Sequence, residues 1–276
     1  MTTQHDTAQL FHSLHTPTTP LALANAWDAA SARLVASTGA RAIATTSAGV
    51  AWGLGAADGN HLDRDQAVAL IARVVNSVSI PVTADIETGF GATPAEVADT
   101  VTRVIAAGAV GVNIEDGHPD GGSALRPVAD QAERLAAARS AADAAGVPLF
   151  INARLDTYLR AVGPQESRLQ ETLDRARAYL DAGASGIFVP GVTDPDTIAA
   201  LTAAIPAPVN ILVGPGAPSV PELSELGVAR VSLGSAVAEA AYAVALRAAT
   251  ELAATGTYTS LTDAIPYGDL NSLMHG

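Results

Sequence analysis

Short apolar runs rich in β-branched residues alternate with alanine-rich stretches from one end of this chain to the other, and this alternation most constrains its fold. Each apolar run has the length and composition of a buried strand, and each is followed by a stretch with helical periodicity. The strands are expected at 21–24, 42–46, 82–86, 110–114, 149–153, 186–189, 209–213 and 229–233. The helices are expected near 28–38, 63–77, 94–107, 128–145, 165–182, 194–204, 219–226 and 235–254.

Eight successive strand–helix units predict an α/β fold of the (β/α)8 TIM-barrel type, with a doubly wound sheet as the alternative. The length of 276 residues suits a single domain over 1–276, with the barrel at about 20–254 and a C-terminal helical arm at about 255–276. Two helix starts are explicit, because Thr93 and Ser219 are each followed three residues later by a glutamate that completes a capping box.

The amino-acid composition excludes several kinds of catalytic chemistry for this chain. It contains no cysteine, and all 15 of its basic residues other than histidine are arginine. Without lysine it cannot form a Schiff base, anchor pyridoxal phosphate or use a P-loop lysine. Without cysteine it has no thiolate nucleophile, disulfide or zinc–thiolate site.

The overall charge also limits the partners. A net charge of -13 argues against nucleic acid and against an anionic membrane surface. The first 20 residues lack the basic start and apolar run of a signal peptide, and no apolar segment of 18 residues follows, so we expect a cytoplasmic protein. A small carboxylate substrate would need local positive charge to bind.

Acidic residues gather where the predicted strands end. Asp85 and Glu87 are two positions apart, so within one strand they would point to the same side, and Glu115 and Asp116 close the next strand. Converging carboxylates raise one another's pKa or need a cation between them, and an all-oxygen ligand set suits a hard divalent ion. Mg²⁺ is therefore the expected metal, with Mn²⁺ as the alternative.

Other polar residues occupy the same ends of the strands, where a barrel carries its active site. Each has a plainer interpretation: Asp58 as a turn residue, Arg154 as a structural cation, Glu115 as its ion-pair partner and His118 as an exposed bystander. Asp85 and Glu87 could instead form a solvated strand end or a salt bridge to an arginine, although acids at the strand ends of a barrel more often belong to its active face. The remaining candidates are Thr46, Ser47, Ala48 and Asn210.

Five segments make the chain resemble the isocitrate lyase/phosphoenolpyruvate mutase superfamily. They are Asn25-Ala-Trp-Asp28, Ala42-Ile-Ala-Thr-Thr-Ser-Ala-Gly49, Thr83-Ala-Asp-Ile-Glu-Thr-Gly-Phe-Gly91, Asn113-Ile-Glu-Asp116 and Ile151-Asn-Ala-Arg154. The third segment carries the specific Asp-x-Asp/Glu-x-Gly-Phe/Tyr-Gly pattern of that superfamily. The resemblance extends over essentially the whole barrel, from about residue 25 to about residue 235.

The resemblance implies roles for individual residues. Asp85 would bind Mg²⁺, while Glu87, Glu115 and Asp58 hold the water ligands of the ion. The turn at Thr46, Ser47 and Ala48 would grip a 2-oxo carboxylate together with the metal, and Arg154 and Asn210 would face the substrate. Members of the superfamily stabilise an enolate of a 2-oxo acid and cleave or form a C–C bond, or move a phosphoryl group. They also tend to form tetramers that exchange the last helix, which implies a homo-oligomer here, a dimer or a tetramer.

One segment departs from the superfamily. The isocitrate and methylisocitrate lyases carry a cysteine and lysines in the loop after the fourth strand, whereas 117–126 here contains neither and offers only His118 and Arg126 as a proton donor or positive charge. Its three glycines suggest a segment able to close over the metal. The resulting expectation is a Mg²⁺-dependent lyase of a small 2-oxo or 2-hydroxy (di)carboxylate that cleaves a C–C bond through a metal-stabilised enolate. The alternatives are a phosphoenolpyruvate mutase or phosphonopyruvate hydrolase type of C–P enzyme, and an inactive barrel that binds 2-oxo acids.

Overall fold

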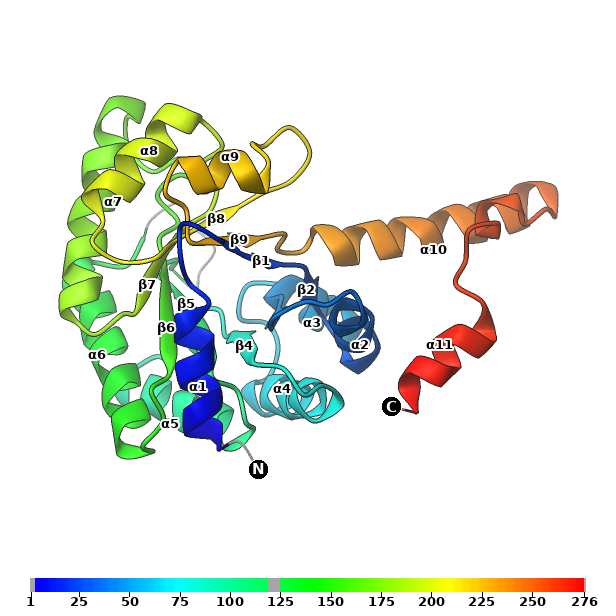
Figure 1. Ribbon diagram of the computed structural model, residues 1–276, viewed down its shortest axis with the longest axis horizontal. Coiled ribbons are helices and arrows are strands. Elements are labelled where there is room, and N and C mark those ends of the chain that lie inside the picture. The colour runs from blue at the N-terminus through cyan, green and yellow to red at the C-terminus, as the bar shows by residue number, and fades with distance from the viewer. Residues whose placement is uncertain (1–2, 119–124, 276) are drawn as a thin grey trace.

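A computed structural model describes residues 3–118 and 125–275 of the chain. Its sheet is a barrel of parallel strands (Figure 1), in which each strand from β2 to β8 pairs with the next along the chain and β1 pairs with β9. The first predicted strand is split at Ala24, so that β1 pairs with β9 while β2 pairs with β3. When β1 and β2 are counted as one strand, the barrel has the eight strands that the sequence predicts. The strands are β1 (Leu21–Leu23), β2 (Asn25–Ala26), β3 (Ile43–Thr45), β4 (Val82–Asp85), β5 (Gly111–Glu115), β6 (Phe150–Arg154), β7 (Gly186–Val189), β8 (Val209–Leu212) and β9 (Arg230–Ser232).

The helices that surround the barrel lie at the predicted positions, with ends within one residue of those expected. Thr93 and Ser219 form the two predicted capping boxes. The helices are α2 (Ala29–Ser37), α4 (Arg64–Ser77), α5 (Pro94–Ala106), α6 (Val128–Ala144), α7 (Gln165–Asp181), α8 (Pro195–Ala204), α9 (Val220–Glu225) and α10 (Ala236–Thr255). Two further helices, α1 (Gln4–Ser13) and α3 (Ser47–Gly53), were not expected.

Helix α1 packs against the end of the barrel at which the strands begin. Gly111 is the first residue of β5, and a Cβ atom added there would lie 2.8 Å from the ring of Phe11 on α1. His15 follows α1 and stacks on Phe150, the first residue of β6, with ring centroids 3.9 Å apart. The glycine therefore leaves the space that the aromatic residues fill, and the open end of the barrel is the one where the strands finish.

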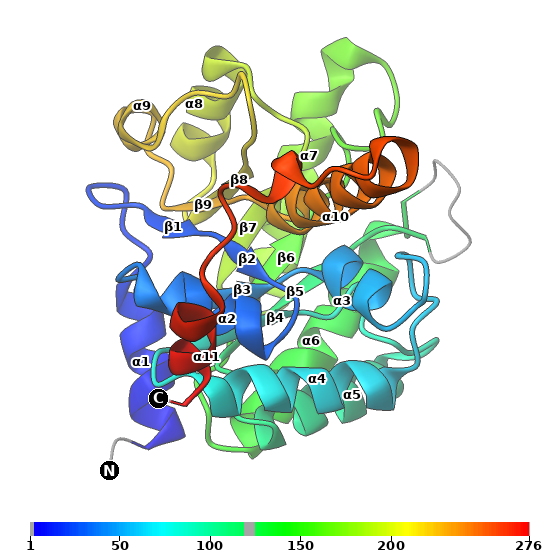
Figure 2. The ribbon, with the colours of Figure 1, turned by 90° about the vertical axis from the view of Figure 1, so that its right-hand side faces the viewer.

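The C-terminal segment forms an arm that leaves the barrel. Helix α10 projects away from the strands, and α11 (Tyr267–Met274) follows a short 3₁₀ turn, η1 (Thr259–Leu261) (Figures 1 and 2). Arg33 on α2 donates to the carbonyl of Leu273, 2.9 Å away. Large apolar side chains along the arm remain exposed, among them Leu246 at 70% and Tyr267 at 84%. None of the helices within 3–118 and 125–275 is long and apolar enough to cross a membrane.

Candidate active site

Three of the predicted site residues are the last residues of three neighbouring strands. Asp85 ends β4, Glu115 ends β5 and Arg154 ends β6. Glu115 and Arg154 are register partners in the sheet, and the Oε2 atom of Glu115 lies 2.8 Å from Nη1 of Arg154. The fold thus brings these side chains together at the open end of the barrel, as the sequence predicted.

Glu87 also lies at the open end of the barrel, but not because it belongs to the same strand as Asp85. Strand β4 stops at Asp85, so the alternation of side chains along one strand does not apply to Glu87. Its backbone is left-handed instead, with φ of 52°, which turns the buried carboxylate toward the backbone N–H of Asn60 that donates to it. Non-glycine residues held in this conformation concentrate at functional sites.

The cluster of carboxyl groups has raised pKa values. Burial raises the pKa of Glu87 to about 8, and the charges of Asp85, Asp58 and Glu115 add to the effect. Burial likewise raises the pKa of Glu115 to about 7, although the Arg154 cation opposes the shift. The pKa of Asp85 also rises through burial, against hydrogen bonds from the N–H groups of Glu87 and Ser47. The site therefore favours either bound protons or a bound cation.

The donor set fits a magnesium ion that keeps most of its water. Within the described residues, no three side chains of His, Cys, Asp or Glu lie close enough to hold a metal together. Mg²⁺ in proteins is commonly bound through one or two carboxylates and several waters, so it does not need a closed cage of side chains. Asp85 as the direct ligand, with Glu87 and Glu115 bonded to water ligands, is compatible with this arrangement.

Arg154 is held on two sides by carboxylates. Its Nε and Nη2 atoms donate to Asp156 at 2.7 and 3.2 Å, and its Nη1 atom pairs with Glu115. Burial works against the cation, but the charges of Glu115, Asp156 and Asp85 outweigh it and raise the pKa of Arg154. The plainer interpretation of Glu115 as an ion-pair partner is therefore confirmed, alongside its place in the acidic cluster.

Sequence reasoning missed the residues behind Arg154. Asp156 is fully buried, accepts from Arg160 at 3.1 Å and receives no solvent contact. Its backbone N–H donates to Asp116, which also accepts from Tyr179 and Arg175 at 3.0 and 3.2 Å. The Arg-x-Asp spacing could have suggested Asp156, whereas nothing in the sequence links Asp116 to α7.

The predicted carboxylate-binding turn lies beside Asp85. Ser47 and Ala48 begin α3 directly after β3, and both are buried. Thr45 at the end of β3 accepts from the backbone N–H of Asp85 at 2.9 Å. The turn is thus joined to the strand that carries the acidic cluster, while Thr46 makes no side-chain cap to α3.

The remaining candidates differ in their surroundings. Asp58 is exposed, yet its charge acts on both Asp85 and Glu87. Asn210 is buried within the barrel, where its Oδ1 accepts from Ser232 and its Nδ2 has no hydrogen-bond partner among the described residues. His118 is half-buried, and the residues 119–124 of the predicted closing segment lie outside the described part of the chain. Asp28 caps α2, and its side chain accepts a hydrogen bond from the backbone N–H of Ser31.

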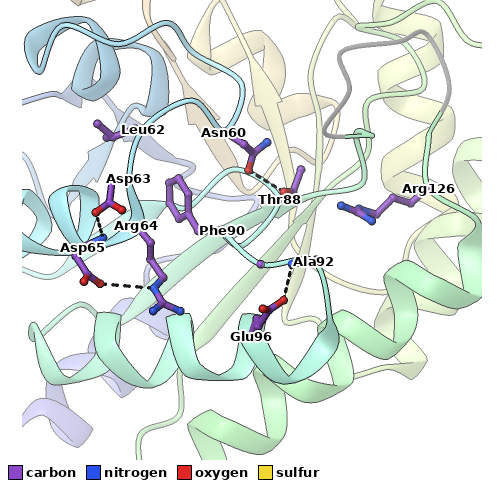
Figure 3. A pocket seen from close by; sticks show the side chains of 11 residues that line it. Asn60, Leu62, Asp63, Arg64, Asp65, Thr88, Phe90, Ala92, Glu96 and Arg126 are labelled. Atoms are coloured by element: carbon purple, nitrogen blue, oxygen red, sulfur yellow. Dashed lines mark hydrogen bonds and ion pairs between the residues drawn. The ribbon is translucent and has the colours of Figure 1, made fainter.

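A cavity of about 570 Å³ that the sequence did not predict lies next to the acidic cluster (Figure 3). It opens between the loop before α4 and the loop that joins β4 to α5. Asn60 and Thr88 line it and are joined by a hydrogen bond of 2.8 Å. Asn60 also donates to Glu87, so the cavity and the acidic cluster share a wall.

Comparison with known proteins places this site in a family. The profile of the phosphoenolpyruvate phosphomutase family matches residues 11–253. A proposed phosphonomutase from Burkholderia cenocepacia J2315 has 47% identity and a TM-score of 0.85, over 88% of this chain and 98% of that structure. A proposed lyase/mutase from the same organism has 42% identity and a TM-score of 0.90, over 99% and 97%.

A curated relative extends the comparison to an enzyme. The 2-methylisocitrate lyase of Salmonella typhimurium is 31% identical over 194 residues, which are 69% of this chain and 64% of that protein. The predicted resemblance is confirmed. The family match over most of the barrel, together with these relatives, shows that the chain belongs to the isocitrate lyase/phosphoenolpyruvate mutase superfamily of lyases and mutases.

Proposed function

We propose that this protein is a Mg²⁺-dependent lyase that cleaves a C–C bond in a small 2-oxo or 2-hydroxy (di)carboxylate. One observation carries the proposal: Asp85, Glu87 and Glu115 form a cluster of carboxyl groups with raised pKa values beside the half-buried Arg154. A chain without lysine has no iminium route to stabilise a carbanion next to a carbonyl, so a metal is the remaining Lewis acid.

Asp85 would hold the metal directly, and Glu87, Glu115 and Asp58 would hold its water ligands. When bound, Mg²⁺ or Mn²⁺ would polarise the 2-oxo group and its neighbouring carboxylate. The raised pKa values support this assignment, because a divalent cation would offset the burial, and the smaller mutual repulsion, that disfavour the charged carboxylates.

The protein's own groups orient the substrate. Arg154 faces its carboxylate, and Ser47 and Ala48 present backbone N–H groups beside Asp85. In a 2-hydroxy dicarboxylate the 2-hydroxyl gives up its proton, the C2–C3 bond breaks, and its electron pair passes to the fragment that carries the distal carboxylate. The enolate of that fragment then takes up one proton at C3, which leaves a 2-oxo acid and a monocarboxylate. Asp58 and His118 are the candidates for proton transfer, since both stand at the open end of the barrel.

The second candidate activity acts on a C–P bond. The family profile and the proposed phosphonomutase relative favour it. Neither activity can use a cysteine proton donor, because the chain has none. For the same reason isocitrate lyase and methylisocitrate lyase are not the proposed activities.

A substrate panel tests the proposal. 2-Methylmalates, oxaloacetate, isocitrates and phosphonopyruvate would each be incubated with the protein and Mg²⁺, and release of pyruvate, glyoxylate and phosphate would be measured. Pyruvate released from a malate derivative or from oxaloacetate supports the lyase. Phosphate released from phosphonopyruvate supports the C–P enzyme, and binding of 2-oxo acids without turnover of any compound supports a binding barrel.

The exposed apolar arm supports a homo-oligomer. Leu246, Leu252, Tyr258 and Tyr267 are each more than 60% exposed, on a segment that projects from the barrel. Apolar surface of this extent commonly marks a protein–protein contact. Exchange of the arm between subunits would bury it, and a dimer or a tetramer would result.

A further inference from the structure

The cavity beside the acidic cluster has the size of a small-molecule site. Its volume of about 570 Å³ lies within the ~300–1,000 Å³ of typical ligand pockets. Leu62 and Phe90 form an apolar side, and Arg126 reaches toward Thr88 from the segment before α6 (Figure 3). The remaining lining residues are Asn60, Asp63, Arg64, Asp65, Gly91, Ala92 and Glu96.

Most charged groups around this cavity already have partners in the fold. Asp63 caps α4 by accepting from the N–H groups of Asp65 and Gln66. Glu96 caps α5 by accepting from Ala92 and Thr93. Arg64 pairs with Asp99 at 2.9 Å. Asp63 and Glu96 are engaged at the two helix starts and Arg64 in an ion pair, so these groups are poorly placed to bind a ligand as well.

Arg126 is the exception. Its Nε atom is buried without a hydrogen-bond partner, and its guanidinium makes no ion pair with any residue in the described ranges 3–118 and 125–275. The backbone of Arg126 is fixed on both sides: its N–H donates to the carbonyl of Asp116 at 2.9 Å, and its carbonyl accepts from Arg175 at 3.0 Å. A buried donor on a fixed backbone that has no partner indicates a missing acceptor.

A second cation increases the positive potential at the same end of the cavity. Arg134 is buried and donates to the carbonyls of Thr88, Gly91 and Ala92 at 2.6, 2.7 and 3.1 Å. Burial, followed by the charge of Arg126, lowers the pKa of Arg134 to about 10. The hydrogen-bond donors of Arg134 are occupied by the carbonyl groups of the loop. An anion entering the cavity would therefore meet two adjacent positive charges, of which Arg126 is the one able to donate hydrogen bonds to it.

We propose that this cavity receives the distal carboxylate of the substrate, with Arg126 as its partner and with Leu62 and Phe90 against the adjoining hydrocarbon. The proposal rests on the proposed function, which places the reacting end of the substrate at Asp85 and Arg154. The shared wall at Asn60 and Thr88 puts the cavity next to that reacting end. Arg126 would then determine the preference for dicarboxylates over monocarboxylates, because a guanidinium binds a carboxylate through two parallel hydrogen bonds.

Two matched ligand pairs test the proposal by calorimetry in the presence of Mg²⁺. Malate is compared with 2-hydroxybutyrate, and 2-oxoglutarate with 2-oxopentanoate, so that each pair differs only in a distal carboxylate in place of a methyl group. The wild type should bind at least one dicarboxylate more tightly than its partner. Arg126→Met should reduce that preference by on the order of tenfold to a hundredfold, the usual value of a hydrogen-bonded charge pair, and should leave the monocarboxylate affinity unchanged.

Control variants separate charge from folding and from the proposed function. Arg64→Met removes a cation from the same cavity that already has an acidic partner, and it should leave the preference intact. Arg126→Lys should restore part of the preference, since it keeps the charge but not the fork. The inference alone would be overturned if Arg126→Met lost affinity equally for the dicarboxylate and the monocarboxylate of a pair. It would also be overturned if the wild type bound pyruvate but did not prefer either dicarboxylate over its monocarboxylate. A wild type that binds no 2-oxo or 2-hydroxy acid would instead overturn the proposed function.

Discussion

Arg154 and Asp156 meet through two parallel hydrogen bonds, in which Nε donates to Oδ1 at 2.7 Å and Nη2 donates to Oδ2 at 3.2 Å. The third nitrogen of the guanidinium pairs with Glu115. The plane of the guanidinium is therefore fixed within the protein before any ligand arrives. A substrate carboxylate at the open end of the barrel would meet a preorganised cation, and this lowers the entropic cost of binding.

The first prediction concerns Asp156. Asp156→Asn removes the charge that orients Arg154 but keeps its size, so kcat/KM should fall by roughly tenfold to a hundredfold, the usual cost of losing a charged hydrogen bond. The matched control is Asp174→Asn, because Asp174 pairs with Arg177 on the surface at 3.7 Å. Steady-state kinetics on both variants check it. Equal rates in the two variants would show that Asp156 has no part in positioning Arg154.

The second prediction concerns Arg154 itself. Arg154→Lys should weaken substrate binding substantially, because an ammonium group cannot bond to two carboxylates and a ligand with the geometry of a planar guanidinium. We expect a rise in KM together with a drop in kcat. Near-normal kinetics in the lysine variant would mean that the role of Arg154 is structural.

The third prediction concerns the metal. Asp85→Ala should lose Mg²⁺ binding and activity together, because a hard cation depends on charged oxygen ligands. Titration calorimetry with Mg²⁺ measures the first effect, and Asp194→Ala, which removes an exposed carboxylate that caps α8, is the control. Unchanged Mg²⁺ affinity in Asp85→Ala would exclude it as the ligand.

The fold was largely predictable because its signals are local. Hydrophobic periodicity and helix caps located the strands and the eight outer helices, and each signal lies within a few residues of the element it marks. Helix α3 was missed because Ser47–Gly53 contains two glycines and makes no side-chain cap, and its stability comes from burial of Val50 and Ala51. Helix α1 was missed because its role depends on a contact with Gly111, about one hundred residues away in sequence.

The site was predictable only in part. Strand-end positions identified Asp85, Glu115 and Arg154, since parallel strands bring their ends together in any barrel. The turn of Glu87 toward Asn60 depends on a left-handed backbone that a pattern of alternating side chains cannot reveal. Whether the Arg126 guanidinium meets an acid within residues 3–118 and 125–275 depends on which acids the fold has engaged elsewhere, and that is a property of the folded molecule alone.

The fourth prediction concerns the arm. Burial of one large apolar side chain stabilises an interface by about 1.5–3 kcal/mol, so Leu246→Ser combined with Leu252→Ser should weaken an oligomer that buries α10. Sedimentation velocity should show a smaller species than for the wild type. Leu159→Ser, on the barrel surface and 47% exposed, is the control. The same sedimentation coefficient for all three proteins would remove α10 from the interface.

The last prediction concerns His15, which lies buried against Phe150 at the closed end of the barrel. Burial lowers the pKa of His15 to about 3, and the charge of Arg230 adds to the effect. In the unfolded chain the pKa is about 6.5, so the unfolded state binds the proton more readily below that value. The stability that neutral His15 contributes is therefore complete above about pH 6.5, and it is lost as the pH falls toward 3.

His15→Phe keeps an aromatic ring on Phe150 and removes the titration. Between pH 6.5 and 5 the wild type should lose stability relative to this variant by about 1.4 kcal/mol per pH unit at most, because that is the value of one proton. Thermal unfolding of both proteins at each pH measures the difference. Glu87 and Glu115 are present in both proteins, so their contribution to the pH dependence of stability cancels in the comparison. Their raised pKa values would otherwise increase the stability of the folded protein as the pH falls. Parallel unfolding curves across this range would mean that the folded protein accepts a proton at His15 as easily as the unfolded chain does.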